Sequence, residues 1–409
     1  MKKSLIAIIA ALVICIAAAA VTACGKKESD STSVSSESEP ITDTESTSET
    51  TDEELQPSAG LSYRINKDEK SCTVSRGVCA DVNVVIPSVS PDGYAVTAIA
   101  DSAFANCGGI MSITIPNGVT HIGAKAFADC IDLTSVKIPN SVISIGNNAF
   151  SGCSRIKSIT IPESVTSIGG GAFDSCIRLA EITIPNRVTS IGGSAFKDCT
   201  GLTNITIPDN VTSIGGAAFS GCTGLTSITI PEGVTSIDAN TFSSCTGLTN
   251  ITIPDSVTSI DGEAFSDCTG LTSITIPDSV TSIEQRTFKG CTGLTNITIP
   301  NRVTSIGDYA FSDCTGLTNI TIPDNVTSIG WDTFSGCYGL TSITIPNSIT
   351  SIGWCAFISC RNLTNIYYNG TIDQWNAIRK NDYWDKNTGD YTVHCTDGNY
   401  WKQVLTDYI

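Results

Sequence analysis

The sequence predicts an α/β solenoid, a stack of 23-residue rungs with short parallel strands on one face. Two observations lead to this fold. The twelve phenylalanines of the chain follow one another at a constant interval of 23 residues, from Phe104 to Phe357. Each is followed three positions later by a cysteine, from Cys107 to Cys360. A fixed period of this length is typical of repeat architectures, in which each unit packs only on its neighbours.

Residues 1–23 are predicted to be an export signal. Lys2 and Lys3 precede an apolar stretch, residues 5–20, which is short for a bilayer-spanning helix of ~20 residues. The stretch ends in Val21-Thr22-Ala23-Cys24, which resembles the bacterial lipobox. That resemblance implies that Cys24 carries a lipid and becomes the mature N-terminus. The alternative is an ordinary signal peptide in which Cys24 has no such role.

Residues 24–60 are predicted to be the lipidated cysteine and a disordered acidic tether. Between Glu28 and Ser58 the chain has 31 residues, of which 15 are Ser or Thr and 10 are Asp or Glu. This stretch has no aromatic residue, Lys or Arg. It cannot bury enough apolar surface to offset the entropy of ordering it, so we expect a solvated spacer.

The first part of one rung, residues 225–231, is predicted to form a short strand. Apolar and polar residues alternate through Ser227-Ile228-Thr229-Ile230. Alternation with a period of two points the isoleucines inward and the Ser and Thr side chains outward. Pro231 has no backbone N–H and therefore ends the strand.

The rest of the rung is predicted to form a second side and a helical turn. Val234 and Ile237 bring the chain back along the second side. Residues 241–245 suit one turn of helix, in which Phe242 and Cys245 share the inward face because they are three positions apart. A single rung would leave both faces of this apolar layer wet, so only the stack is stable.

The repeated pattern is Leu-x-x-Ile-x-Ile-Pro-x-x-Val-x-x-Ile-Gly-x-x-Ala-Phe-x-x-Cys. Over roughly residues 61–395 it resembles the BspA-type leucine-rich repeat of bacterial surface proteins. The resemblance implies a leucine-rich-repeat-like, right-handed parallel solenoid at residues 104–366. Residues 61–103 depart from the repeat as an N-terminal cap with an Asp92-Gly93 turn, and residues 367–409 form a C-terminal cap in which 372–378 have helical spacing.

The cysteines of the column are predicted to be free, buried, structural thiols, because parallel Cβ directions disfavour disulfides between rungs and no histidine accompanies them as a metal ligand. Cys72, Cys79, Cys355 and Cys395 lie outside the 23-residue spacing. Cys72 and Cys79 either cross-link or stay free. Cys395 follows His394, but no third group orients the pair, and we expect no catalytic dyad there.

Composition excludes several classes of function. The chain carries a net charge of −17 and only two histidines. A nucleic-acid binder needs a basic surface to displace counterions, so nucleic acid is not an expected partner. No nucleophile elbow, phosphate-binding loop, dinucleotide motif or zinc-protease motif occurs. We therefore expect no enzyme, no catalytic residue, no metal and no cofactor.

The resemblance implies a membrane-anchored protein of the bacterial cell surface that acts as an adhesin, through protein–protein or protein–glycan attachment. Its expected partners are surface proteins or glycans of a host or a neighbouring cell, and its only contact with the membrane is the lipid anchor. Two alternatives remain. The chain is a structural envelope or display protein with no specific ligand, or it is an enzyme with a site in the C-terminal cap.

Aromatic residues near the C-terminal end provide the candidate ligand site. All five tryptophans lie beyond residue 300, and Trp331 and Trp354 occupy the same slot of adjacent rungs, so their rings are expected to stack. Exposed aromatic clusters serve recognition. The alternative is that these rings pack against the cap around Trp375 and Trp384. The candidate ligand-binding residues are Tyr309, Trp331, Tyr338 and Trp354.

Overall fold

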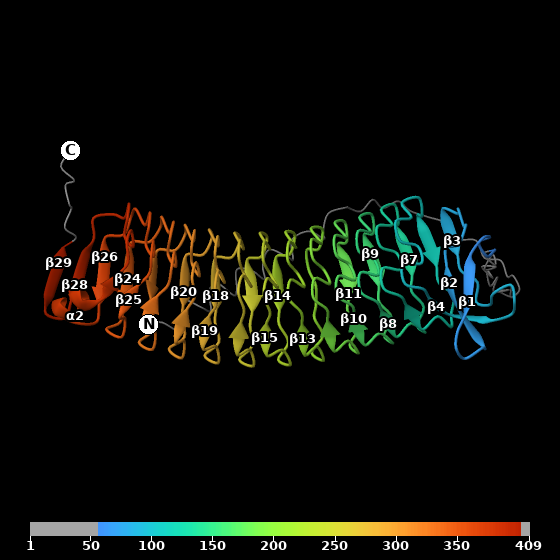
Figure 1. Ribbon diagram of the computed structural model, residues 1–409, viewed down its shortest axis with the longest axis horizontal. Coiled ribbons are helices and arrows are strands. Elements are labelled where there is room, and N and C mark those ends of the chain that lie inside the picture. Colours follow the sequence, from blue (N-terminus) through green and yellow to red (C-terminus); the bar gives the residue numbers. More distant parts are fainter. Residues whose placement is uncertain (1–55, 402–409) are drawn as a thin grey trace, which may run out of the picture. The chain divides into compact units, whose positions relative to one another are not determined.

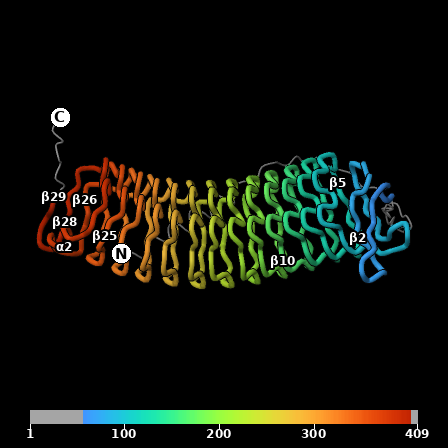
Figure 2. The backbone as a smooth tube through the Cα atoms, in the orientation of Figure 1, coloured from blue at the N-terminus to red at the C-terminus, as the bar shows by residue number. Residues whose placement is uncertain are grey.

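The computed structural model describes residues 56–401. The predicted signal peptide, the predicted lipidation site Cys24 and nearly all of the predicted tether lie outside the described residues. The described residues form an elongated solenoid of about fourteen turns, seen as a ribbon in Figure 1 and as a backbone tube in Figure 2. Ser58, which the predicted boundary at residue 60 assigns to the tether, is buried, and its N–H donates to the Val85 carbonyl at 2.9 Å.

Each turn of the repeat has three sides, and the first side carries the short strand predicted around Ile228. Ser227 and Thr229 are exposed and Ile228 is buried, as the alternation predicts. Where neighbouring strands pair they are parallel and in register, and only the last pair is antiparallel. The pairing is interrupted at several turns, and residues 203–207 form no strand. The first-side strands are β3 (Asn83–Val85), β5 (Ser112–Thr114), β7 (Ser135–Lys137), β9 (Ser158–Thr160), β11 (Glu181–Thr183), β14 (Ser227–Thr229), β16 (Asn250–Thr252), β18 (Ser273–Thr275), β20 (Asn296–Thr298), β22 (Asn319–Thr321), β24 (Ser342–Ile345), β26 (Asn365–Tyr368), β28 (Thr392–Cys395) and β29 (Gly398–Trp401).

The second side is a stack of shorter strands that begin after the proline turn. In the repeats each consists of an outward serine or histidine and a buried isoleucine. They pair in parallel, and β1 (Ser62–Ile65) closes the N-terminal edge in the antiparallel sense. The others are β2 (Ser71–Ser75), β4 (Ala95–Ile99), β6 (His121–Ile122), β8 (Ser144–Ile145), β10 (Ser167–Ile168), β12 (Ser190–Ile191), β13 (Ser213–Ile214), β15 (Ser236–Ile237), β17 (Ser259–Ile260), β19 (Ser282–Ile283), β21 (Ser305–Ile306), β23 (Ser328–Ile329), β25 (Ser351–Ile352) and β27 (Arg379–Lys380).

The third side, which carries the phenylalanine and the cysteine, is not helical, so the predicted α/β class is wrong and the fold is a β-solenoid. Residues two before and two after each phenylalanine have positive φ, as Asn240 (60°) and Ser244 (60°) do beside Phe242. A helix needs one sign of φ throughout, so this alternation turns successive N–H groups toward the next turn of the solenoid instead. The Phe242 N–H, for example, donates to the Ala264 carbonyl at 2.9 Å.

The core is continuous from end to end because every turn contributes the same inward residues. The twelve phenylalanine rings are stacked, with centroids 5.2 to 5.7 Å apart and ring planes within 17° of parallel. Separations in this range are typical of offset-stacked aromatic pairs. Trp384 closes the C-terminal end of the stack, edge-on to Phe357 at 6.0 Å.

All sixteen cysteines among residues 56–401 are free, so Cys72 and Cys79 do not cross-link. The twelve column thiols are buried, as predicted. The structure also adds Cys79 to the column. The Arg76 N–H donates to the Ala103 carbonyl just as the Phe104 N–H donates to Ala126, so Arg76 aligns with Phe104 and Cys79 with Cys107. The longer cap turn between them hides this alignment in the sequence.

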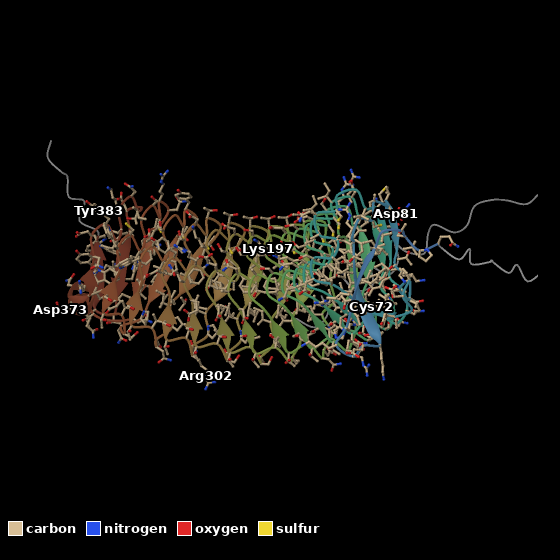
Figure 3. All side chains as sticks on the ribbon, turned by 45° about the vertical axis from the view of Figure 1, so that its right-hand side comes forward. Cys72, Asp81, Lys197, Arg302, Asp373 and Tyr383 are labelled. Atoms are coloured by element: carbon tan, nitrogen blue, oxygen red, sulfur yellow. The ribbon has the colours of Figure 1, made fainter. Side chains whose placement is uncertain are left out.

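The turn and the helical segment predicted in the two end regions are both present in the structure. Gly93 follows Asp92 with a φ of +87°, which accounts for a glycine in the predicted turn. The predicted helical segment is α2 (Ile372–Ala377), the one helix among residues 56–401, and it starts at a capping box formed by Thr371 and Gln374. Figure 3 shows Asp373 of α2 at the opposite end of the solenoid from Cys72 of β2.

Candidate functional site

Trp331 and Trp354 lie at the corner where the second side turns into the third. Each comes two residues after a second-side strand, β23 or β25. Strand β25 pairs with β27, and Ile352 lies opposite Lys380, so Asp382 takes the slot of Trp354 in the following turn. The equivalent slot of the preceding turn holds a second carboxylate. We call this row of four residues the aromatic corner: Asp308, Trp331, Trp354 and Asp382.

The two indoles are among the most exposed large side chains of the solenoid. Trp331 is 55% exposed and Trp354 is 50% exposed, whereas Trp375 inside the cap is 2% exposed. An open pocket of about 260 Å³ lies against both indoles, and Lys380, Asn381 and Asp382 complete its lining. The alternative of packing against the cap holds in part for Trp354, which contacts Tyr383 of the cap, but half or more of each indole surface stays exposed.

Glycine precedes both indoles because the preceding turn approaches closely there, and a Cβ at Gly353 would lie 2.6 Å from the backbone C and O atoms of Gly330. A Cβ at Gly353 would come within 2.9 Å of Cδ1 of Trp331, and one at Gly330 within 2.5 Å of Oδ1 of Asp308. The same Asp308 oxygen accepts a hydrogen bond from the Trp331 N–H at 2.7 Å. The carboxylate thereby fixes the backbone from which the first indole projects.

The predicted stack of Trp331 on Trp354 is not found. Trp354 instead stacks on Tyr383 of the next turn, with centroids 6.3 Å apart, and the Lys386 ammonium lies 4.7 Å from the Tyr383 ring centroid. Figure 3 shows Tyr383 at the C-terminal end of the solenoid. Among residues 56–401, Trp331 has no stacked aromatic partner, so no other aromatic ring covers its indole.

Tyr309 lies in the neighbouring slot, where it belongs to a row of side chains that link adjacent turns. The Arg286 guanidinium forms a 3.0 Å ion pair with Glu263 and lies 5.3 Å from the Tyr309 ring centroid. The Asp332 carboxylate raises the pKa of the Tyr309 hydroxyl, and partial burial raises the pKa of Asp332 itself. Tyr309, at the edge of the aromatic corner, therefore already interacts with Arg286 and Asp332.

Tyr338 is not brought to this site. It follows Cys337, at the other end of the third side, and is not among the residues that line the pocket. Its ring lies 5.4 Å from the Arg361 guanidinium. Of the four candidate aromatic residues, the pocket therefore brings together Trp331 and Trp354, and neither Tyr309 nor Tyr338 lines it.

Three polar residues that line the pocket were missed by sequence reasoning, namely Lys380, Asn381 and Asp382. Asp308 lines a second pocket, which shares Trp331 and Asn381 with the first. Ser351 pairs with Arg379 across 28 positions, so the last turn is longer than the repeat and its residues cannot be placed by counting 23. Lys380 fills a slot that holds isoleucine elsewhere. Its ammonium donates to the Trp375 carbonyl at 2.6 Å, and burial lowers its pKa.

The repeat itself identifies the family. The model of the BspA-type leucine-rich repeat region matches residues 97–224, 190–315 and 281–378, which together cover more than half of the chain. The chain belongs to the BspA-type leucine-rich repeat family. Members of this family are typically surface-associated and are typically structural or binding proteins.

Solved structures of similar proteins agree with this family. A leucine-rich repeat protein from Bacteroides ovatus is 30% identical, with 82% of this chain and 98% of that chain covered and a TM-score of 0.56. A leucine-rich cell surface protein from Faecalibacterium prausnitzii is 31% identical over 79% and 97% of the two chains, with a TM-score of 0.49. The pneumococcal vaccine antigen PcpA, at 19% identity over 82% and 98% of the chains and a TM-score of 0.53, shares the fold. No curated protein matches the chain.

The adjacent residues His394 and Cys395 of this BspA-type chain are not arranged as a dyad. His394 contacts the side-chain oxygens of Asn365 and Asn399, at 2.9 and 3.2 Å, and stacks on Tyr367, so its ring nitrogens are not directed at Cys395. Over residues 56–401 no group of three or more His, Cys, Asp or Glu side chains is arranged to hold a metal ion. In the same range, none of the helical structure is long and apolar enough to cross a bilayer.

Proposed function

We propose that this BspA-type protein is a lipid-anchored adhesin of the bacterial cell surface, which attaches to proteins or glycans through its aromatic corner. The observation that carries the proposal is the pair of half-exposed indoles, Trp331 and Trp354, beside an open pocket. Large exposed aromatic side chains are rare on monomeric surfaces and are enriched where partners bind. Lipid attachment at Cys24 would place this surface outside the cell.

The polar columns of the repeat support the choice of this corner over other surfaces. Many Thr and Ser hydroxyls elsewhere in the repeat form hydrogen bonds between adjacent turns. Thr249 Oγ1 donates to the Thr226 carbonyl at 3.1 Å, and Ser256 Oγ donates to the Val234 carbonyl at 2.9 Å. These groups satisfy carbonyls that neighbouring turns would otherwise leave exposed. The Trp331 indole differs from these groups, because no hydrogen bond or ring contact of this indole with another turn is found among residues 56–401.

The proposal is tested by cell attachment. Bacteria that express the full chain should adhere to immobilised matrix proteins or glycans, and the double variant Trp331→Ala/Trp354→Ala should lose most of that adhesion. Tyr338→Ala is the matched control, because it removes an exposed aromatic ring away from the pocket. Cys24→Ser should release the protein into the medium and abolish adhesion.

Either of two results would reject this function. If no surface supports adhesion, the structural or display alternative is favoured. If adhesion is the same in the double variant and in Tyr338→Ala, the chain binds through another surface.

A further inference from the structure

The aromatic corner combines two exposed indoles with polar side chains, some of which have no hydrogen-bond partner among residues 56–401. Within residues 56–401 the side chains of Asn381 and Asp382 form no hydrogen bond or ion pair, although both line the pocket with Trp331 and Trp354. At the other end of the row, Asp308 uses one oxygen for the Trp331 N–H. A ligand of this site must therefore offer an apolar face to the rings and hydrogen-bond donors to the carboxylates.

Charge excludes two kinds of ligand. A purely apolar ligand would remove the Asp382 carboxylate from water without replacing its hydrogen bonds, at a cost that apolar contact does not repay. An anionic ligand would meet Asp308 and Asp382 at the two ends of the row. The Lys380 ammonium is half-buried and points at the carbonyls of Trp375 and Ile378. Among the described residues, Arg379, which is exposed and lines the neighbouring pocket with Asp308, is then the one exposed cation of these two pockets against two carboxylates.

The spacing of the row also constrains the ligand. Asp308, Trp331, Trp354 and Asp382 come from four consecutive turns, and neighbouring strands of a sheet lie about 4.8 Å apart. That repeat is close to the length of one sugar residue in an extended oligosaccharide. A pyranose ring has C–H faces that pack on the electron-rich face of an indole, and hydroxyls at its rim that donate to carboxylates.

We propose that the aromatic corner binds a neutral oligosaccharide, whose sugar rings pack on Trp331 and Trp354 and whose hydroxyls donate to Asp382 and Asp308. This inference rests on the proposed function and names the ligand class of the same site. Stacking of Trp354 on Tyr383 holds one indole in a fixed orientation, so little side-chain freedom is lost on binding. Asn381 supplies both a donor and an acceptor beside it.

The test is calorimetric titration of the full chain, purified in detergent, with glucose, galactose and mannose oligomers of one to six residues. At least one series should bind, with affinity that rises up to about four residues and then levels off. Trp331→Ala and Trp354→Ala should each raise Kd by about tenfold or more, the factor that corresponds to ~1.4 kcal/mol. Asp382→Asn should weaken binding less, because the amide oxygen still accepts a hydrogen bond.

Controls separate this inference from the proposed function. Tyr338→Ala should leave Kd within about twofold of the parent, since a change distant from the contact couples weakly. Oligomers that contain uronic acids should bind more weakly than neutral oligomers of the same linkage. Asp382→Asn should reduce the difference in Kd between the two kinds of oligomer.

The inference is overturned if no oligosaccharide binds while the chain still binds deglycosylated matrix proteins in a manner that requires Trp331 and Trp354. In that case the proposed function survives and its partner is a protein. It is also overturned if acidic oligomers bind best. Failure of the proposed function has a different signature, namely the absence of both saccharide and protein binding.

Discussion

Each thiol of the cysteine column from Cys130 onward donates a hydrogen bond to the carbonyl of the phenylalanine in the turn before it. The Cys130 Sγ lies 3.1 Å from the Phe104 carbonyl oxygen, and the Cys245 Sγ lies 3.1 Å from that of Phe219. The thiol is thus a small buried side chain that also satisfies a carbonyl. Burial raises the pKa of the Cys130 thiol from 9.0 to about 12 and that of Cys245 well above its ordinary value.

This burial predicts a loss of stability at high pH. In the unfolded chain the column thiols ionise near pH 9, whereas in the folded chain they keep their protons, so the unfolded state binds fewer protons above pH 9. The free energy of unfolding should fall as pH rises from about 9 toward 12, by up to ~1.4 kcal/mol per pH unit for each thiol.

Thermal unfolding of the parent and of Cys245→Ala between pH 7.5 and 11 checks this. The variant should be less stable at pH 7.5, because it has a cavity and the Phe219 carbonyl keeps only its hydrogen bond from the Cys222 N–H, and its deficit in stability should shrink as pH rises. A deficit that stays constant across the range would contradict the raised pKa of Cys245.

At the scale of the element, the third side shows what the sequence pattern left undetermined. The inward positions of Phe242 and Cys245 were predicted correctly, because three-residue spacing places both on one face in a helix and in this alternating backbone alike. The sequence signal for this backbone conformation lies instead at the position two residues after each phenylalanine. It holds only Asn, Asp, Gly or Ser, the residues that best tolerate positive φ: Asn106, Asp129, Gly152, Ser175, Asp198, Gly221, Ser244, Asp267, Gly290, Asp313, Gly336 and Ser359.

The phenylalanine stack predicts that the stability lost when one phenylalanine is truncated to alanine depends on its position in the stack. Phe242 is fully buried between two rings, 5.7 Å from that of Phe219 and 5.6 Å from that of Phe265. Phe242→Ala should cost about 3–5 kcal/mol and uncouple the two halves of the solenoid, because each turn packs only on its neighbours. Phe104→Ala removes a ring with one stacked neighbour, Phe127, and should cost less.

Hydrogen exchange measured by mass spectrometry distinguishes these variants. In Phe242→Ala, protection should fall in the turns on both sides of the substitution, and in Phe104→Ala it should fall only near the N-terminal cap. Thr229→Ala, at an exposed position of the same turn as Phe242, is the control and should change stability by no more than ~0.5 kcal/mol. Equal effects of the two phenylalanine variants would contradict a stack whose turns depend on their neighbours.

At the scale of the whole molecule, regular spacing predicts nearly all of the fold and three of the four residues of the aromatic corner. Counting in steps of 23 residues places Asp308, Trp331 and Trp354 in one row. The same counting cannot reach Asp382, because the turn that contains α2 is longer, and it does not show that Trp354 stacks on Tyr383. Residues whose slots depend on an irregular turn have to be placed by its hydrogen bonds.

The solenoid as a whole has one end that differs from the rest of its surface. The N-terminal half exposes aliphatic side chains such as Val78 and Ile131, whereas the exposed aromatic rings Trp331, Trp354 and Tyr383 gather near the C-terminal cap. Under the proposed function, this group of exposed rings is where a partner binds.

The measurement that tests this account most directly is an array of matrix proteins and glycans, probed in parallel with the full chain, with Trp331→Ala/Trp354→Ala and with Tyr338→Ala. We expect a small set of saturable signals that disappear in the double variant and persist in Tyr338→Ala. A blank array, or signals that survive the loss of both indoles, would contradict the claim that the aromatic corner is a binding site.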